Sequence, residues 1–380
     1  MFFKNARLFT SDFQFHTGAF EVTNGRFGAI LPESVPENAV DLQGATVIPG
    51  LIDIHTHGNS GADFSDGDPD GLKKISAYLL RSGITAFTPT SMTLPYDRLE
   101  AAFMTARQQV DTAPEGCARL LGIHMEGPFF SEKKKGAQNA AYLKAPDFPG
   151  FQRLYDACGG LIRIVDVAPA LPGAVEFTKQ ASSLCTVSVA HTDAAYPQAK
   201  AVFEAGATHL THLFNAMPGI HHRNPGVIPA AAENPLVRAE LIGDGLHVHS
   251  AVMRLAFSMF GKERIVLISD ALRCCGMPDG IYELGGQQVC LTDGIARLAD
   301  GTIAGSASNL FQCMKNAISF GIPEADAIRA ATYNPACAIG AEHEVGSIRQ
   351  GLQADFLVCD SDYTLSRVFL GGNVISLEKT

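Results

Sequence analysis

The feature that most constrains the fold is an alternation, from about residue 46 to residue 343, of β-branched apolar runs with stretches of helical periodicity. The apolar runs predict strands at 46–55, 84–90, 119–126, 162–168, 185–191, 207–212, 238–244 and 264–270. Helical periodicity predicts helices at 69–82, 96–110, 173–183, 194–205, 250–261, 306–320 and 323–333. Eight β and α units in about 290 residues are typical of a (β/α)8 TIM-like barrel, for which ~250 residues is usual.

The two ends of the chain do not follow this alternation. Residues 1–48 and 344–380 are typical of short strands joined by turns, such as "TNGRFG" and "LGGNV". Each end alone is too short to bury a core. We therefore expect the two ends to pair as a small β-sandwich domain beside a barrel domain at 49–343. An open doubly wound sheet is the alternative, but no GxGxxG follows the first strand and no GxxxxGK[ST] occurs.

Charge and cysteine usage narrow the class of protein. The formal net charge of −10 argues against nucleic-acid and membrane-surface partners, which require a broad basic face. The first residues offer no secretory apolar region, and no segment supplies the roughly 20 apolar residues of a membrane span. The nine cysteines show no CxxC spacing, which favours reduced thiols and a cytoplasmic location.

Polar side chains close most of the expected barrel strands. They are His55 and His57 on the first strand, Glu126 on the third, His191 on the fifth, His212 on the sixth and Asp270 on the eighth. In a barrel of this type the chemistry takes place at the carboxyl ends of the strands. We therefore expect these side chains to meet at one mouth of the barrel.

The histidine pair in "DIHTHG" is compatible with a metal site. Residues i and i+2 of a strand point to the same face, so His55 and His57 can converge on one ion. Two hydrogen-bonded histidines in a turn are the alternative interpretation.

Glu126 in "LLGIHMEGPFF" ends an apolar strand that contains no lysine or arginine. A buried carboxylate needs a cation, which is either a metal ion or a distant arginine. With His191 and His212 it makes a three-ligand set that leaves room for water, as catalytic metal sites do. His209 lies three residues before His212, on the opposite face of the strand, so we expect a core or supporting histidine there.

Asp270 in "RIVLISDALR" has two candidate roles beside a metal. It is either a further ligand or the base that takes a proton from water whose pKa the metal has lowered to ~7. A helix N-cap is the simpler alternative.

Two loops are candidates for substrate binding. "NAMPGIHHRNPG" carries His221, His222 and Arg223, and the arginine fork suits a carboxylate or a phosphate, although a solvated loop is the alternative. "GDGLHVHS" adds His247 and, as a further candidate, His249. Lys133 to Lys135 form a charge run to which we assign no role.

In order along the chain, "DIHTHG", "HMEGPF", "VAHTDA", "THLFNAMPG", "GDGLHV" and "ISDA" resemble the metal-dependent amidohydrolase superfamily, and within it the N-acetylglucosamine-6-phosphate deacetylases. The resemblance runs from about residue 40 to "GLQADFLVCD". It implies hydrolysis of the acetamide of N-acetylglucosamine 6-phosphate to glucosamine 6-phosphate and acetate. It also implies one or two divalent metal ions per subunit and a homodimer. Carboxylate and imidazole ligands suit zinc, iron and manganese alike, so all three stay candidates.

The resemblance further implies a role for each matching residue. Glu126, His191 and His212 match metal ligands, Asp270 matches the acid/base, and His55 and His57 match members that hold a second ion, with Glu126 as a candidate bridge. The residues that match a substrate pocket are Asn215, Ala216, His247 and, from the neighbouring subunit, the phosphate-binding Arg223. Gln138 in "KKKGAQNAAY" stands where some relatives have a histidine that helps to hold the acetyl group. Cys274 and Cys275 follow Asp270 closely in the sequence, and nothing beyond the packing of small residues explains this pair.

Three other functions stay open. The galacto epimer of the substrate differs from the gluco sugar by one hydroxyl orientation. A cyclic-amide hydrolase or a deaminase would share the metal site, but many cyclic-amide hydrolases use a modified lysine at the fourth strand end, and "RIVDVAPAL" has none. A metal-dependent binding protein without catalysis would not need Asp270.

Overall fold

The computed structural model describes residues 1–377, and its larger part is a barrel of eight parallel strands. The barrel strands, in order around it, are β6 (Leu51–Thr56), β9 (Ile84–Ser91), β11 (Ile123–Met125), β12 (Ile162–Val167), β13 (Thr186–Val189), β14 (His209–Leu210), β15 (Arg238–Ile242) and β16 (Ile265–Ile268). A short strand, β10 (Arg119–Leu120), also pairs with β9. The predicted (β/α)8 barrel is therefore confirmed.

The barrel closes between its last and first strands at the carboxyl end. The amide N of Asp270 donates to the carbonyl O of His55 at 2.9 Å, and the amide N of His57 donates to the carbonyl O of Ala271 at 2.8 Å. Deeper inside, the hydroxyl of Ser269 donates to the carboxylate of Asp53 at 2.5 Å. This closure places the two histidines of the first strand beside Asp270.

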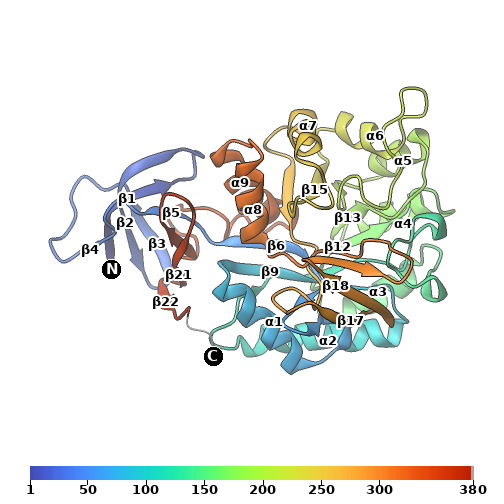
Figure 1. The fold of residues 1–380 in the computed structure, drawn as a ribbon, viewed down its shortest axis with the longest axis horizontal. Coiled ribbons are helices and arrows are strands. Elements are labelled where there is room, and N and C mark those ends of the chain that lie inside the picture. Colours follow the sequence, from blue (N-terminus) through green and yellow to red (C-terminus); the bar gives the residue numbers. More distant parts are fainter. Residues whose placement is uncertain (378–380) are drawn as a thin grey trace.

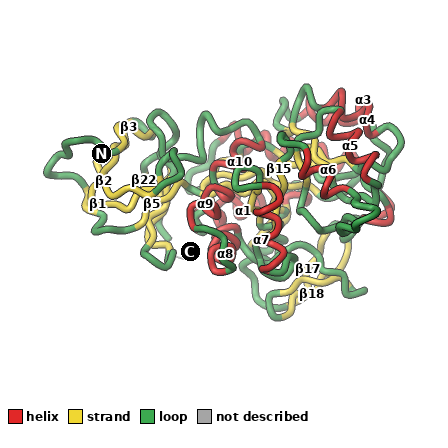
Figure 2. Tube along the Cα trace, turned by 90° about the horizontal axis from the view of Figure 1, so that it is seen from above, coloured by secondary structure: helices red, strands yellow, loops and turns green. Residues whose placement is uncertain are grey.

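Helices surround the barrel (Figure 2). They are α1 (Pro69–Arg81), α2 (Tyr96–Thr112), α3 (Phe148–Ala157), α4 (Ala174–Ala181), α5 (Tyr196–Glu204), α6 (Val227–Glu233), α7 (Ser250–Phe260), α8 (Leu310–Ser319), α9 (Glu324–Ala331) and α10 (Tyr333–Ala338). Helices α3, α6 and α10 were not predicted from the sequence. Asp147 caps α3 by accepting from the amide of Gly150, so a proline and a glycine in its first turn start a helix instead of a loop. Among residues 1–377, no helix combines the length and apolarity needed to cross a bilayer.

Three strands interrupt the last β/α unit, where the sequence analysis assigned none. They are β17 (Gly280–Leu284), β18 (Gln287–Thr292) and β19 (Ile295–Leu298), and they form an antiparallel sheet. A two-strand ribbon, β7 (Gly58–Asn59) with β8 (Ala62–Asp63), follows the first barrel strand. Leu284 at the end of β17 lines the cavity described below, so this insertion forms part of the wall of the barrel mouth.

The two chain ends form one small β domain at one end of the elongated molecule (Figure 1). Its strands are β1 (Phe2–Phe9), β2 (Phe15–Thr23), β3 (Arg26–Ile30), β4 (Val40–Asp41), β5 (Thr46–Pro49), β20 (Phe356–Cys359), β21 (Leu365–Leu370) and β22 (Asn373–Ile375). All eight belong to one mostly antiparallel sheet. Phe20 of β2 and Phe356 of β20 meet edge to face, with ring centroids 5.1 Å apart, so the N-terminal and C-terminal segments share one core.

The predicted strand at 46–55 is two strands in the structure. β5 belongs to the β domain and β6 to the barrel, and Gly50 separates them. A Cβ atom at Gly50 would lie 2.0 Å from the hydroxyl of Thr85, so only glycine fits at this crossing. The apolar run is continuous because both strands are buried.

Candidate metal and catalytic site

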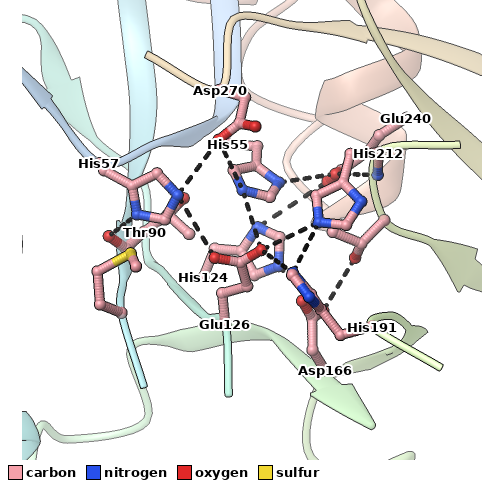
Figure 3. A network of polar contacts seen from close by, with 12 residues as sticks. His55, His57, Thr90, His124, Glu126, Asp166, His191, His212, Glu240 and Asp270 are labelled. Carbon is pink, nitrogen blue, oxygen red and sulfur yellow. Dashed lines mark hydrogen bonds and ion pairs between the residues drawn. The ribbon is translucent and has the colours of Figure 1, made fainter. Parts of the chain in front are cut away.

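Three of the predicted strand-end residues form a tight group at the barrel mouth. Nε2 of His191 and Nε2 of His212 each lie 3.1 Å from Oε1 of Glu126, and the two nitrogens are 3.0 Å apart (Figure 3). All three side chains are buried. Their donor atoms are close enough to one another to hold one metal ion.

The histidine pair of β6 forms a second group around the same carboxylate. Nε2 of His57 lies 3.4 Å from Oε2 of Glu126, and Nε2 of His55 lies 3.7 Å from its Oε1. Oδ1 of Asp270 is 3.2 Å from Nε2 of His57 and 3.5 Å from Nε2 of His55. Glu126 therefore lies between two ligand groups, with Asp270 on the side of the histidine pair.

The backbone turns sharply where three of these side chains leave their strands. His191, His212 and Asp270 have φ angles of 41°, 29° and 49°, in the left-handed region that residues with a Cβ seldom adopt. Such strained positions persist where the surrounding structure fixes them, and they concentrate at functional sites. Asp270 does not cap a helix, because no helix follows it directly.

The imidazoles of His191 and His57 are oriented by bonds at their outer nitrogens. Nδ1 of His191 lies 2.9 Å from the carbonyl O of Lys134, and Nδ1 of His57 lies 3.1 Å from the carbonyl O of Thr90. A carbonyl only accepts, so these Nδ1 atoms carry a hydrogen, and when the ring is neutral Nε2 presents a lone pair. Within residues 1–377, Nε2 of His55 is buried without a hydrogen-bond partner. Lone pairs that converge on a carboxylate, with the far nitrogens anchored, are the arrangement that a divalent cation requires.

Electrostatics in the cluster favour a bound cation. Burial would raise the pKa of Glu126, but hydrogen bonds from His191 and His212 hold it well below its usual value. Burial opposes a charged imidazolium at His57, but Asp270 and Glu126 outweigh it and raise the pKa of His57 to about 9. Burial also opposes a charged imidazolium at His212, but Glu126 outweighs it and raises the pKa of His212 to about 9. The cluster thus attracts positive charge, which protons supply when no metal ion does.

A cavity of about 220 Å³ opens over this cluster. Its lining includes these residues that the sequence analysis selected: His57, Glu126, Gln138, His191, His212, Asn215, Ala216, His247 and Asp270. The structure therefore brings together nearly all of the predicted site residues.

Two cavity residues have partners that the sequence did not indicate. Nε2 of Gln138 donates to Oε2 of Glu126 at 2.8 Å, and its Oε1 accepts from the amide of Thr93 at 2.7 Å. Nδ1 of His247 lies 2.6 Å from Oδ2 of Asp244, which orients the other ring nitrogen. Gln138 therefore holds Glu126 in place in addition to lining the cavity.

The predicted phosphate-binding loop does not reach the cavity within one chain. Arg223 is exposed and lines a separate hollow of about 560 Å³, together with residues 193–197. Its guanidinium lies 2.6 Å from Nε2 of His222. His249 accepts from the amide of Ala251 and caps α7, and Lys133 pairs with Asp193.

A second polar layer lies beneath the cluster, and His209 is the one member that the sequence predicted to have a core or supporting role. Its members are Asp53, His124, Asp166 and Glu240, all 0% exposed, together with His209. Nε2 of His124 lies 3.0 Å from Oδ1 of Asp166, and Nε2 of His209 lies 3.1 Å from Oε1 of Glu240. In the sequence, the buried carboxylates of this layer could have been recognised as single acidic residues within apolar strands, as in "RIVDV" and "VRAELIG". Cys274 and Cys275 are also buried, and nothing in the structure explains their pairing in sequence.

Residues 46–375 match the Amidohydrolase family. The chain is 33% identical over 384 residues to the N-acetylglucosamine-6-phosphate deacetylase of Bacillus subtilis (strain 168), which covers 99% of this chain and 97% of that protein. It is 32% identical over 372 residues to the N-acetylgalactosamine-6-phosphate deacetylase of Escherichia coli O157:H7, covering 97% of this chain and 98% of that one.

Among solved structures, the chain is similar to a mutant N-acetyl-D-glucosamine-6-phosphate deacetylase from Mycobacterium smegmatis in complex with N-acetyl-D-glucosamine-6-phosphate. The TM-score is 0.93 at 33% identity, and the match covers 99% of both chains. The similarity therefore includes the β domain as well as the barrel.

Proposed function

The chain belongs to the amidohydrolase family, and on that premise we propose that it is a metal-dependent deacetylase that hydrolyses N-acetylglucosamine 6-phosphate to glucosamine 6-phosphate and acetate. The observation that carries this proposal is the buried group of Glu126, His191 and His212, with Asp270 at the same cavity. A divalent cation held there would polarise the amide carbonyl and lower the pKa of a water molecule.

We propose that the site holds one or two divalent ions. Zinc, iron or manganese would suit its carboxylate and imidazole ligands. Glu126, His191 and His212 would hold the first, and His55 and His57 would hold the second, with Glu126 shared between them. The two carboxylate oxygens of Glu126 support this sharing, because Oε1 faces His191 and His212 whereas Oε2 faces His57.

Asp270 is the proposed acid/base. Burial would raise its pKa, but the hydrogen bond from His57 and the nearby imidazoles lower it, so the carboxylate is charged and able to accept a proton. In the proposed reaction it takes a proton from the attacking water and then donates it to the leaving amine as the C–N bond breaks. Its Oδ1 lies 3.2 Å from Nε2 of His57 and 3.5 Å from Nε2 of His55, so the acid/base lies directly beside the proposed second ligand pair.

The cavity would bind the sugar through Asn215, Ala216, His247 and Gln138, which line it. Arg223 would supply the phosphate contact from a second copy of the chain, because within one chain it lies on another hollow. Binding of the remote phosphate would position the acetamide over Asp270 and Glu126. We therefore propose a homodimer, and the nine free cysteines suit a reducing cytoplasm.

The galacto epimer is a second candidate substrate, because the chain is as similar to an N-acetylgalactosamine-6-phosphate deacetylase as to the gluco enzymes. A cyclic-amide hydrolase is less well supported, since β12 ends at Val167 with no lysine beside it.

The experiment is a comparison of acetate release from N-acetylglucosamine 6-phosphate, its galacto epimer and unphosphorylated N-acetylglucosamine, with metal-analysed protein. We expect fast release from the phosphorylated gluco sugar and at least about 100-fold slower release without the phosphate. Faster release from the galacto epimer would reassign the substrate. No release from any of the three sugars by metal-containing protein would refute the proposal.

A further inference from the structure

Glu240 of β15 is a carboxylate in the barrel interior that the proposed reaction does not use. It is 0% exposed, and the ion pairs that it makes within residues 1–377 are all with histidines. A buried carboxylate is costly unless hydrogen bonds or a cation compensate its charge. The groups that surround it therefore indicate its role.

Three hydrogen bonds converge on Glu240. Its Oε2 lies 2.8 Å from Nδ1 of His55 (Figure 3) and 3.1 Å from the backbone N of His212. Its Oε1 lies 3.1 Å from Nε2 of His209. As an ionised carboxylate Glu240 can only accept, so Nδ1 of His55 carries the hydrogen. The lone pair of His55 is therefore on Nε2.

That lone pair points at the metal-ligand cluster. Among the described residues Nε2 of His55 has no hydrogen-bond partner; it is buried and lies 3.7 Å from Oε1 of Glu126 and 3.5 Å from Oδ1 of Asp270. A buried polar atom without a partner requires an explanation, and a cation between these atoms provides one.

We propose that Glu240 is the positioning residue of the second cation site: its carboxylate fixes His55 as a metal ligand and strengthens it as a donor. This inference rests on the two-ion arrangement of the proposed function. His57 and His191 are anchored by neutral backbone carbonyls, whereas His55 is backed by a full negative charge. A carboxylate behind a ligating histidine raises the basicity of the ligand and fixes its orientation. Loss of the charge should thus weaken the second site more than the first.

The chain offers a closely matched variant pair. Glu240→Gln keeps the shape and one acceptor oxygen but removes the charge behind His55. Asp166→Asn removes an equally buried charge in the same layer, where the carboxylate contacts His124 and Thr211 but not His55. A general effect of a lost interior charge would appear in both variants, and a specific effect on His55 only in the first.

The test is calorimetric titration of metal-depleted protein with Zn²⁺, without sugar, and metal analysis after gel filtration. We expect two ions per chain in the unmodified protein and in Asp166→Asn. In Glu240→Gln we expect one tight ion and a second whose affinity is about 10–100-fold weaker. Two tight ions in Glu240→Gln, one ion in the unmodified protein, or the same loss in both variants would overturn the inference.

A measurement on the unmodified protein covers the case in which Glu240→Gln does not fold. In protein labelled with ¹⁵N-histidine and loaded with Zn²⁺, the ring of His55 should carry its proton on Nδ1. A proton on Nε2 would overturn the inference. Because neither measurement uses a sugar, failure of the deacetylation assay and failure of this inference are distinguishable.

Discussion

The ligand cluster at the barrel mouth and the loop at 218–226 are built in contrasting ways. In the cluster, Glu126 is buried among four histidines, and three of these have their outer nitrogen anchored by a carbonyl or a carboxylate. In the loop, Arg223 is exposed, its guanidinium contacts the neighbouring His222, and it lies outside the cavity. One chain therefore holds all residues of the proposed reaction centre, whereas the proposed phosphate contact would need a second chain.

The largest expected effect comes from a substitution beside the ligand cluster. Asp270→Asn should lower kcat for acetate release by about 10²–10⁴-fold, because the proton transfer to the leaving amine loses its acid/base. Bound metal, measured on the same preparation, should change little, since Glu126, His191 and His212 are untouched. Unchanged turnover would remove Asp270 from the proposed reaction.

An intermediate effect is expected from the loop. Arg223→Ala removes charge-assisted hydrogen bonds to phosphate, which are worth about 1.5–3 kcal/mol. KM for the phosphorylated sugar should rise by roughly 10–100-fold, with metal content unchanged and little change for the unphosphorylated sugar. Equal effects on the two sugars would show that the loop acts on something other than the phosphate.

Metal affinity should depend on pH at the cluster. The pKa values of His57 and His212 are raised to about 9 in the metal-free protein, so protons compete with the metal ion below that pH. Zn²⁺ affinity should increase from pH 6.5 towards 9, by roughly tenfold per unit for each displaced proton, and level off above. Calorimetry in two buffers of different ionisation enthalpy measures this proton release, and a pH-independent affinity would contradict it.

The same pKa shifts determine how the folding stability of the metal-free protein changes with pH. Protonated His57 and His212 stabilise the folded state below the unfolded pKa of about 6.5, and this contribution is lost as the pH rises through about 9. The bound metal ion should reverse this trend.

The smallest effect is expected at the exposed rim. Lys133→Ala removes a lysine that is 83% exposed and pairs with Asp193. A pair so open to solvent contributes little, so KM and kcat should stay within about twofold. A large rise in KM would show that the charge run contributes to phosphate binding, and that Arg223 is not the main cation.

Strand ends could be predicted from the sequence because a barrel places them all at one mouth. Glu126, His191 and His212 each follow an apolar run, and this pattern alone placed them together. Glu240 could not be selected in the same way, because a lone carboxylate inside an apolar strand has no visible partner until the fold brings His55 against it. The boundary between β5 and β6 at Gly50 could not be predicted either. Both strands are buried, so their residues form one continuous apolar run although they belong to different domains.

Recovery of turnover on metal addition tests the central claim most directly. Metal-depleted protein would be assayed for acetate release from N-acetylglucosamine 6-phosphate before and after stepwise addition of Zn²⁺ or Mn²⁺. The account predicts no release before addition and a rise in turnover that parallels the binding of the first ion. Full turnover in protein shown to be free of metal would contradict it.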